Sequence, residues 1–311
     1  MTETTRDPPS PFTLCPPFDS TGGDVQLRSS DGVDFHVHRL VLSLASPFFK
    51  DMFSLPQPDP GLEVATIQMS ETASVLYRAL RFWYPGAEPP AIQTLDELRE
   101  MLEVLILKYD MQFIVPAAKK HLREFLAEDS VAVFAIACRH EWRDVALEAA
   151  KSSLRLPIRA FESRPAQLEY MTADTYHSLL HYHTKCAIVA TASTSALRWA
   201  SYADIPGTGC TNWKNPTVCP RARAGHWTFA HNTLGPLTAW FSACLDILAA
   251  TLLQSPAATL DSPDFLSQAV EKIGACESCR SEGFPALMKF LGILRAQIEH
   301  DLDSVELDLQ F

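Results

Sequence analysis

The sequence lacks several features that mark specialised classes of protein. Its 26 Lys and Arg residues are outnumbered by 37 Asp and Glu residues, which gives a net charge of −11 at pH 7. An acidic chain of this kind is a poor binder of nucleic acid or anionic membranes through bulk charge. Eight cysteines in 311 residues are too few for a disulfide scaffold. We therefore expect an intracellular protein, cytoplasmic or nuclear, whose cysteines are thiols.

Long apolar runs are also missing. The first ten residues contain no apolar core of a secretory signal. The longest apolar stretch, residues 239–253, is interrupted by Asp246 and falls short of the roughly 20 residues that a membrane helix needs. Hydrophobic residues nevertheless make up 47% of the chain. At roughly 150 residues per domain, this length and composition predict about two globular domains.

The first 23 residues are rich in proline, which removes backbone donors and stops helices. We interpret residues 1–23 as a flexible arm. Apolar and polar residues then alternate over residues 24–28 and 33–37, with an Asp-Gly pair between them. This pattern is typical of a β-hairpin.

Helical patterns and one further strand follow the hairpin. Helices are expected over residues 38–44, from Ser46-Pro47 onward, and over residues 76–83, and a third strand over residues 63–68. A capping box, Thr94 with Glu97, begins an amphipathic helix that we expect to continue to Tyr109. These patterns therefore predict one α+β module over residues 24–127.

The remainder of the chain, residues 128–311, shows helical periodicity almost throughout. One exception is a segment of Gly, Pro, Thr and aromatic residues, 202–232, which has no periodicity. Loops of this length in compact domains are usually functional or anchored. The predicted fold class is thus an α+β module followed by an all-α region with one long loop.

The segment from Asp24 to Phe53 resembles the BTB/POZ domain in both spacing and residue type. An Asp-Val strand, a strand that ends in His38-Arg39, and the helical pair V-L-S-L-A-S-P-F-F-K-D-M-F follow one another as in that family. The segments 80–85 and 104–111 fit the same pattern, so the resemblance covers roughly residues 24–126. The whole chain is similar to the single-BTB proteins of fungi, whose C-terminal region is helical.

The resemblance implies protein–protein interaction. BTB domains form dimers, and many connect a client to a cullin-type ubiquitin ligase, whereas others recruit transcriptional corepressors. Asp24 and His38 match the polar pair near the dimer-facing pocket, although Asp24 capping a strand edge and His38 capping a helix is an equally good reading. Phe53 and Leu55 lie where the family places partner contacts.

One feature departs from the dimeric members of the family. They often carry an amphipathic helix and an exchanged strand before the Asp-Val strand, where this chain has its proline-rich arm. The arm cannot supply that helix, so a strand-exchanged homodimer is not expected.

The cysteines suggest a second kind of site. Cys276 and Cys279 form a C-x2-C pair, and Cys210 and Cys219 lie in the aperiodic segment with eight residues between them. Together they could provide four thiolates for a structural zinc, with His226 and His231 as alternative ligands. The C-x8-C spacing is not a standard zinc knuckle. Ordinary thiols packed beside Trp213 and Trp227, with no cofactor, are the alternative.

These patterns predict an interaction adaptor that oligomerises, recruits a client to a cullin-type ligase, or does both. The alternative is a nuclear transcription cofactor that acts through BTB-mediated oligomerisation. The expected partners are proteins: a cullin scaffold, a second BTB chain or a client, with no direct contact to nucleic acid or membrane. We expect no enzyme, because the sequence carries no nucleophile elbow, P-loop, dinucleotide fingerprint or H-E-x-x-H motif.

Overall fold

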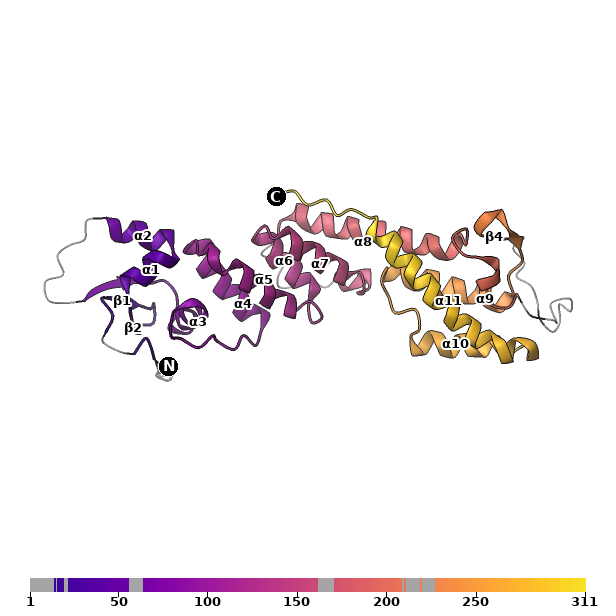
Figure 1. Ribbon diagram of the computed structural model, residues 1–311, viewed down its shortest axis with the longest axis horizontal. Helices are drawn as coiled ribbons and strands as arrows, with labels where there is room; N and C mark the ends of the chain where they lie inside the picture. The colour runs from indigo at the N-terminus through magenta and orange to yellow at the C-terminus, as the bar shows by residue number, and fades with distance from the viewer. Residues whose placement is uncertain are drawn as a thin grey trace, which may run out of the picture. The chain divides into compact units, whose positions relative to one another are not determined.

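The structure is a computed structural model that describes residues 14, 16–19, 22–55, 64–161, 171–208, 210, 219 and 227–311. The chain divides into two compact units, Met1–Leu126 and Ala127–Phe311. Figure 1 shows a small sheet with helices in the first unit and a predominantly helical second unit.

The N-terminal unit is built on a three-stranded sheet in the order β2-β1-β3. Strand β1 (Val25–Arg28) pairs antiparallel with β2 (Asp34–Val37) and parallel with β3 (Ala65–Gln68). Every second hairpin residue points into the core, and four side chains are fully buried there: Val25, Leu27, Phe35 and Val37. The predicted hairpin is therefore confirmed, and Gly32 in its turn has a φ of 86° that suits glycine.

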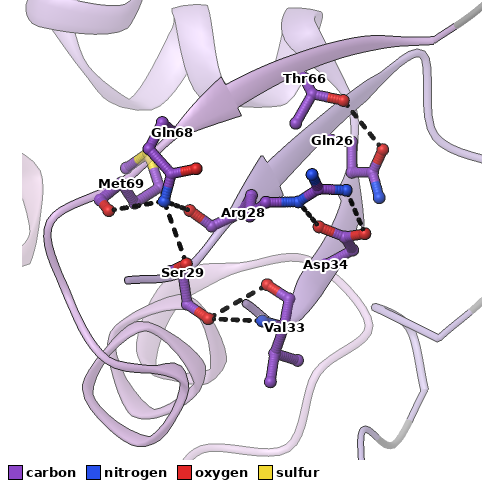
Figure 2. Close-up of polar contacts among 8 residues, drawn as sticks. All are labelled: Gln26, Arg28, Ser29, Val33, Asp34, Thr66, Gln68 and Met69. Carbon is purple, nitrogen blue, oxygen red and sulfur yellow. Dashed lines mark hydrogen bonds and ion pairs between the residues drawn. The ribbon is translucent and has the colours of Figure 1, made fainter. Parts of the chain in front are cut away.

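Polar contacts hold the register at the turn end of this sheet (Figure 2). The guanidinium of Arg28 donates two hydrogen bonds to the Asp34 carboxylate, at 2.6 and 2.8 Å. Ser29 Oγ accepts the backbone N–H of Val33 at 2.9 Å. Across to the third strand, Gln68 Nε2 donates to the carbonyls of Arg28 and Ser29 at 3.2 and 3.1 Å. These contacts disfavour a slip of the strands past one another.

Five α-helices complete the described part of this unit: α1 (Arg39–Ala45), α2 (Pro47–Ser54), α3 (Ala73–Trp83), α4 (Leu95–Leu102) and α5 (Val115–Glu124). The predicted caps are confirmed, because Ser46 Oγ accepts the N–H of Phe49 at 3.3 Å and Thr94 Oγ1 accepts that of Glu97 at 3.2 Å. A 3-10 turn, η2 (Gln112–Ile114), precedes α5.

The expected single α-helix up to Tyr109 is wrong in its second half. After α4 the backbone widens into a π-helical segment, η1 (Glu103–Lys108). The apolar stripe stays buried through this change, and Tyr109 is 2% exposed. Two tertiary contacts favour the wider turn: Ser46 Oγ donates to the Tyr109 carbonyl at 2.5 Å, and the Tyr109 hydroxyl donates to Glu71 at 2.9 Å. The helical periodicity of the sequence carries no information about either of these tertiary contacts.

Part of the predicted flexible arm is packed against the sheet. Phe18 is fully buried, and its carbonyl accepts the backbone N–H of His36 at 3.1 Å. Its ring lies edge-on to Tyr84, with centroids 5.2 Å apart. At Gly23 a Cβ atom would lie 2.5 Å from the Val37 carbonyl oxygen, so the chain passes too close to β2 for any side chain. The described residues 16–19 therefore do not form a free arm.

The C-terminal unit contains six α-helices among its described residues: α6 (Ser130–Arg139), α7 (Arg143–Ser153), α8 (Ala173–Ser195), α9 (Ala239–Gln254), α10 (Pro263–Ile273) and α11 (Glu277–Asp303). Helix α6 packs on α7, and α8 packs on both α9 and α11. Helices α9 and α11 each bury an apolar face. Val270 of α10 is 51% exposed.

Short elements occupy the segment that was expected to be one long loop. A 3-10 turn, η5 (Tyr202–Asp204), a two-residue pairing of β4 (Trp227–Thr228) with β5 (Leu234–Gly235), and the 3-10 turn η7 (Ala230–Asn232) lie in or beside it, and η3 (Ile158–Phe161) lies earlier in the unit. The helical C-terminal region is confirmed, with this small pairing as an addition. Among the described residues, no helix is both long enough and apolar enough to cross a bilayer.

Candidate functional site

The predicted polar pair, Asp24 and His38, lies where β1 begins and α1 begins. Asp24 Oδ1 accepts the backbone N–H of Arg39 at 2.7 Å, so this carboxylate caps α1 rather than a strand edge. His38 occupies the N-cap position, but its side chain makes no capping hydrogen bond. Its Nδ1 lies 2.7 Å from the hydroxyl oxygen of Tyr84, which also accepts the His38 backbone N–H at 3.0 Å. Both residues therefore make contacts within the unit.

Tyr84 was not singled out from the sequence, although it connects the end of α3 to the start of α1. It is 6% exposed, and burial raises the pKa of its phenol. In the sequence, the only signal for Tyr84 was its place in the L-R-F-W-Y-P segment. An aromatic residue before a proline does not by itself indicate which residues it contacts.

The two predicted docking residues at the end of α2 differ in their surroundings. Phe53 is partly buried and stacks on Phe49 with ring centroids 6.2 Å apart. The guanidinium of Arg39 lies 5.4 Å from the centroid of the Phe53 ring. Leu55 is 62% exposed. Phe53 therefore supports α1 and α2 from within, and Leu55 is the residue that presents apolar surface to solvent.

Further exposed apolar side chains lie on α1. Leu40 and Leu44 are 69% and 79% exposed, and their i, i+4 spacing places them on the same face of the helix. Phe48, at the start of α2, is 44% exposed and packs on Tyr109 with ring centroids 5.5 Å apart. The sequence held a signal for this surface, because the seven residues of α1 include more apolar residues than one buried face can hold.

The four cysteines of the predicted metal site come together in the C-terminal unit. The Sγ atoms of Cys210, Cys219, Cys276 and Cys279 all lie within 4.8 Å of one another, and all four residues are buried. Two of the sulfur–sulfur separations are 3.8 Å, between Cys210 and Cys276, and 3.7 Å, between Cys219 and Cys279. Among the described residues, no other group of three or more His, Cys, Asp or Glu side chains is arranged to hold a metal ion.

The C-x2-C pair lies at the start of α11. Cys276 is the N-cap residue and Cys279 lies in the first turn, where unpaired backbone N–H groups favour negative charge. Burial alone would raise the pKa of Cys276, but the nearby backbone N–H of Cys279 and the adjoining thiols lower it to about 7. Burial and the neighbouring sulfurs raise the pKa values of Cys219 and Cys279. Among Cys219, Cys276 and Cys279, the thiol of Cys276 is thus the one that ionises first.

Of the alternative histidine ligands, His231 does not join the cluster. His231 is exposed and has a φ of 56°, and His226 lies outside the described residues. Of the two tryptophans expected beside the thiols, Trp227 forms part of β4 and Trp213 lies outside the described residues. The indole N–H of Trp240, on α9, instead lies close enough to Cys279 to lower the pKa of that thiol.

Clefts lie in the described part of this unit. One, of about 180 Å³, borders the thiol cluster and is lined by parts of 203–210 and 278–289, including Cys210 and Cys279. A larger one, of about 850 Å³, lies among α7, α8, residues 256–261 and α11. Ion pairs neutralise part of its lining, because Lys151 binds Asp303 at 2.7 Å and Arg295 binds Asp261 at 2.8 Å.

Comparison with known families identifies the N-terminal unit. Residues 19–126 match the family model of the BTB/POZ domain. This segment is therefore a BTB/POZ domain, a module for protein–protein interaction, and it is followed by a helical C-terminal region. The resemblance drawn from the hairpin and the helix pair is confirmed, while the fungal single-BTB type stays a prediction. No match to the chain was found among curated proteins.

Proposed function

We propose that the chain is an adaptor whose BTB domain docks onto a cullin-type ubiquitin ligase while its C-terminal unit holds a client protein. The observation that supports this most is the exposed apolar surface of the BTB domain. Leu40, Leu44 and Leu55 are each more than 60% exposed on short helices or at their ends. Burial of one leucine side chain is worth about 1.5–3 kcal/mol, so a few such residues are enough to anchor a partner.

The exposed leucines form two surfaces, and we assign each surface to a different partner. Leu55, beside the partly buried Phe53, is the docking edge for the cullin scaffold. The Leu40 and Leu44 face of α1 is the contact with a second BTB chain. This division keeps the adaptor active as a monomer, because docking to the scaffold does not then depend on self-association.

The cullin assignment is tested by replacing Leu55 with Glu. A charge at the centre of an apolar contact leaves it desolvated and unpaired, so we expect at least tenfold weaker capture of a purified cullin. Leu55 is a better probe than Phe53, whose removal would also disturb its contact with Phe49. Leu234→Glu is the matched control, since Leu234 is 64% exposed in the C-terminal unit. Failure of the folded wild-type chain to bind any cullin would leave an oligomerisation module only.

The oligomeric state is tested by light scattering. The chain has a mass of 34.5 kDa, so a dimer formed through α1 would have twice that mass by light scattering. Leu44→Glu is then expected to return it to a monomer without changing its circular dichroism. A wild-type chain that is monomeric at high concentration would remove α1 as a self-association surface.

A nuclear transcription cofactor is the second candidate. The net charge of −11 favours indirect recruitment through other proteins, because an acidic chain is repelled by DNA. The localisation of a tagged chain separates the two candidates. Exclusion from the nucleus would remove this second function and leave the adaptor intact.

A further inference from the structure

We propose that Cys210, Cys219, Cys276 and Cys279 bind one Zn²⁺ ion as a closed structural site. This site would join Cys210 and Cys219 to the start of α11, and it is independent of how the BTB domain is used. Two ligands come from each of two segments of the chain, and Cys210 and Cys276 are 66 residues apart in the sequence. Four protein ligands leave no open position on the metal, so the site would be structural and not catalytic.

The sulfur positions match the size of a tetrahedral zinc site. Zn–S bonds of about 2.3 Å place sulfurs about 3.8 Å apart along each edge of the tetrahedron. Two of the separations in the cluster are 3.7 and 3.8 Å. The remaining pairs lie within 4.8 Å, so contraction by about 1 Å or less would complete the tetrahedron. A disulfide needs sulfurs about 2.05 Å apart, and all four residues are free cysteines.

The chemistry of the cluster favours a soft divalent cation. Binding would convert four thiols to four thiolates and release four protons, leaving a Zn(SR)₄ centre with a net charge of −2. Cys276 lies at the N-cap of α11, where the partial positive charge of the helix end favours a thiolate ligand. Tetrahedral sites with four sulfur ligands select zinc or iron among the common metals.

The surroundings provide both an outer hydrogen bond and a path to solvent. The buried indole N–H of Trp240 has no hydrogen-bond partner among the described residues, and it is near enough to Cys279 to lower the pKa of that thiol. A metal-bound thiolate is a better acceptor than a thiol, so this N–H would be satisfied when the metal is bound. The cleft of about 180 Å³ that borders Cys210 and Cys279 gives the ion access from solvent.

The site would also explain how an aperiodic segment is held. Described apolar anchors in this stretch are few, with Ile205 and Phe229 buried at 3% and 1% exposure. Gly283 of α11 lies so close to α10 that a Cβ atom would be 2.9 Å from Ile273. The turn between α10 and α11, which carries Cys276, is therefore a tightly packed support onto which a metal would fasten the segment.

The first test measures metal in the full chain, purified under reducing conditions without chelator. Elemental mass spectrometry is expected to find about one zinc ion per chain. In Cys276→Ser the zinc content should fall at least tenfold. Cys138→Ser is the matched control, because Cys138 lies on α6 outside the cluster, and it should keep its zinc. Iron in place of zinc, or a folded chain without metal, would overturn the assignment.

The second test does not depend on a variant that folds. The wild-type chain is stripped of metal with chelator and titrated with Co²⁺, whose four-thiolate complexes absorb strongly in the visible range. We expect saturation at one equivalent and displacement by Zn²⁺. Thiol counting in denaturant with chelator should give all eight cysteines as thiols. Absence of the cobalt spectrum, or only four thiols, would refute the zinc site.

Discussion

The hydroxyl of Tyr84 contacts His38 twice, accepting its backbone N–H at 3.0 Å and lying 2.7 Å from its Nδ1. This pair joins the last residue before α1 to the end of α3. The Tyr84 ring also packs on Phe18, so one side chain connects the arm, the sheet and two helices. His38 and Asp24 thus position α1, the helix that presents Leu40 and Leu44.

Replacing Tyr84 with Phe is expected to destabilise the BTB domain by about 1–3 kcal/mol. The change removes the hydroxyl and leaves the part-buried His38 N–H without its acceptor. His38→Ala keeps that backbone bond and loses only the ring contact, so it should cost less. Urea unfolding followed by circular dichroism measures both. A smaller effect for Tyr84→Phe than for His38→Ala would contradict the dominant role of the backbone hydrogen bond.

Phe18 provides a test of whether the arm is part of the domain. Phe18→Ala is expected to cost about 3–5 kcal/mol, because it empties a fully buried position lined by aromatic rings. Leu40→Ala is the control within the same unit, since Leu40 is 69% exposed and its loss should change stability by less than about 0.5 kcal/mol. Equal midpoints for the two variants in urea would mean that the arm is not packed in solution.

Glu71 gives the domain a pH dependence on the acid side. Burial alone would raise its pKa, but hydrogen bonds from Lys108 and Tyr109 outweigh burial and hold the pKa below the ordinary 4.5. The unfolded chain therefore takes up this proton first as the pH falls. The contribution to stability is fully present above pH 4.5 and is lost as the pH falls through the lower folded-state pKa.

The measurement compares the free energy of unfolding of wild type and Glu71→Gln from pH 7 down to pH 3. The wild type should lose more stability over this range, since the amide does not titrate. Parallel curves for the two proteins would show that Glu71 does not carry the effect.

Much of the BTB domain could be predicted because its hairpin and helix pair carry local signals. Alternation over Val25–Arg28 and Asp34–Val37, the Asp-Gly turn and the Ser46-Pro47 cap each act within a few residues. The π-helical turn after Leu102 and the burial of Phe18 were missed for the opposite reason. Both depend on partners that are distant in sequence, such as Glu71 for Tyr109 and Tyr84 for Phe18.

The cysteine cluster shows the same division between local and distant information. The C-x2-C spacing of Cys276 and Cys279 is a local signal that named one half of the site. The pairing with Cys210 and Cys219 rested on residue type alone, because a C-x8-C spacing has no standard geometry. The exposed face of α1 was missed, since an apolar residue in a short helix is normally taken to be buried.

His140 should make the C-terminal unit sensitive to mild acid. Its ring stacks on Trp142 with centroids 4.9 Å apart, and its Nδ1 is buried without a hydrogen-bond partner among the described residues. Burial, and then the nearby charge of Arg139, lower its pKa from 6.5 to about 4. The unfolded chain binds this proton first, so stability is complete above pH 6.5 and falls until about pH 4.

The variant His140→Phe keeps the stacked ring and removes the titration. Between pH 7 and pH 5 the wild type should lose up to about 2 kcal/mol more unfolding free energy than the variant, at 1.36 kcal/mol per pKa unit. Tryptophan fluorescence in urea follows the unit, because Trp142 lies against the substituted ring. A proton taken up by His140 in the folded state near pH 6.5, seen by NMR titration, would contradict the buried, neutral imidazole.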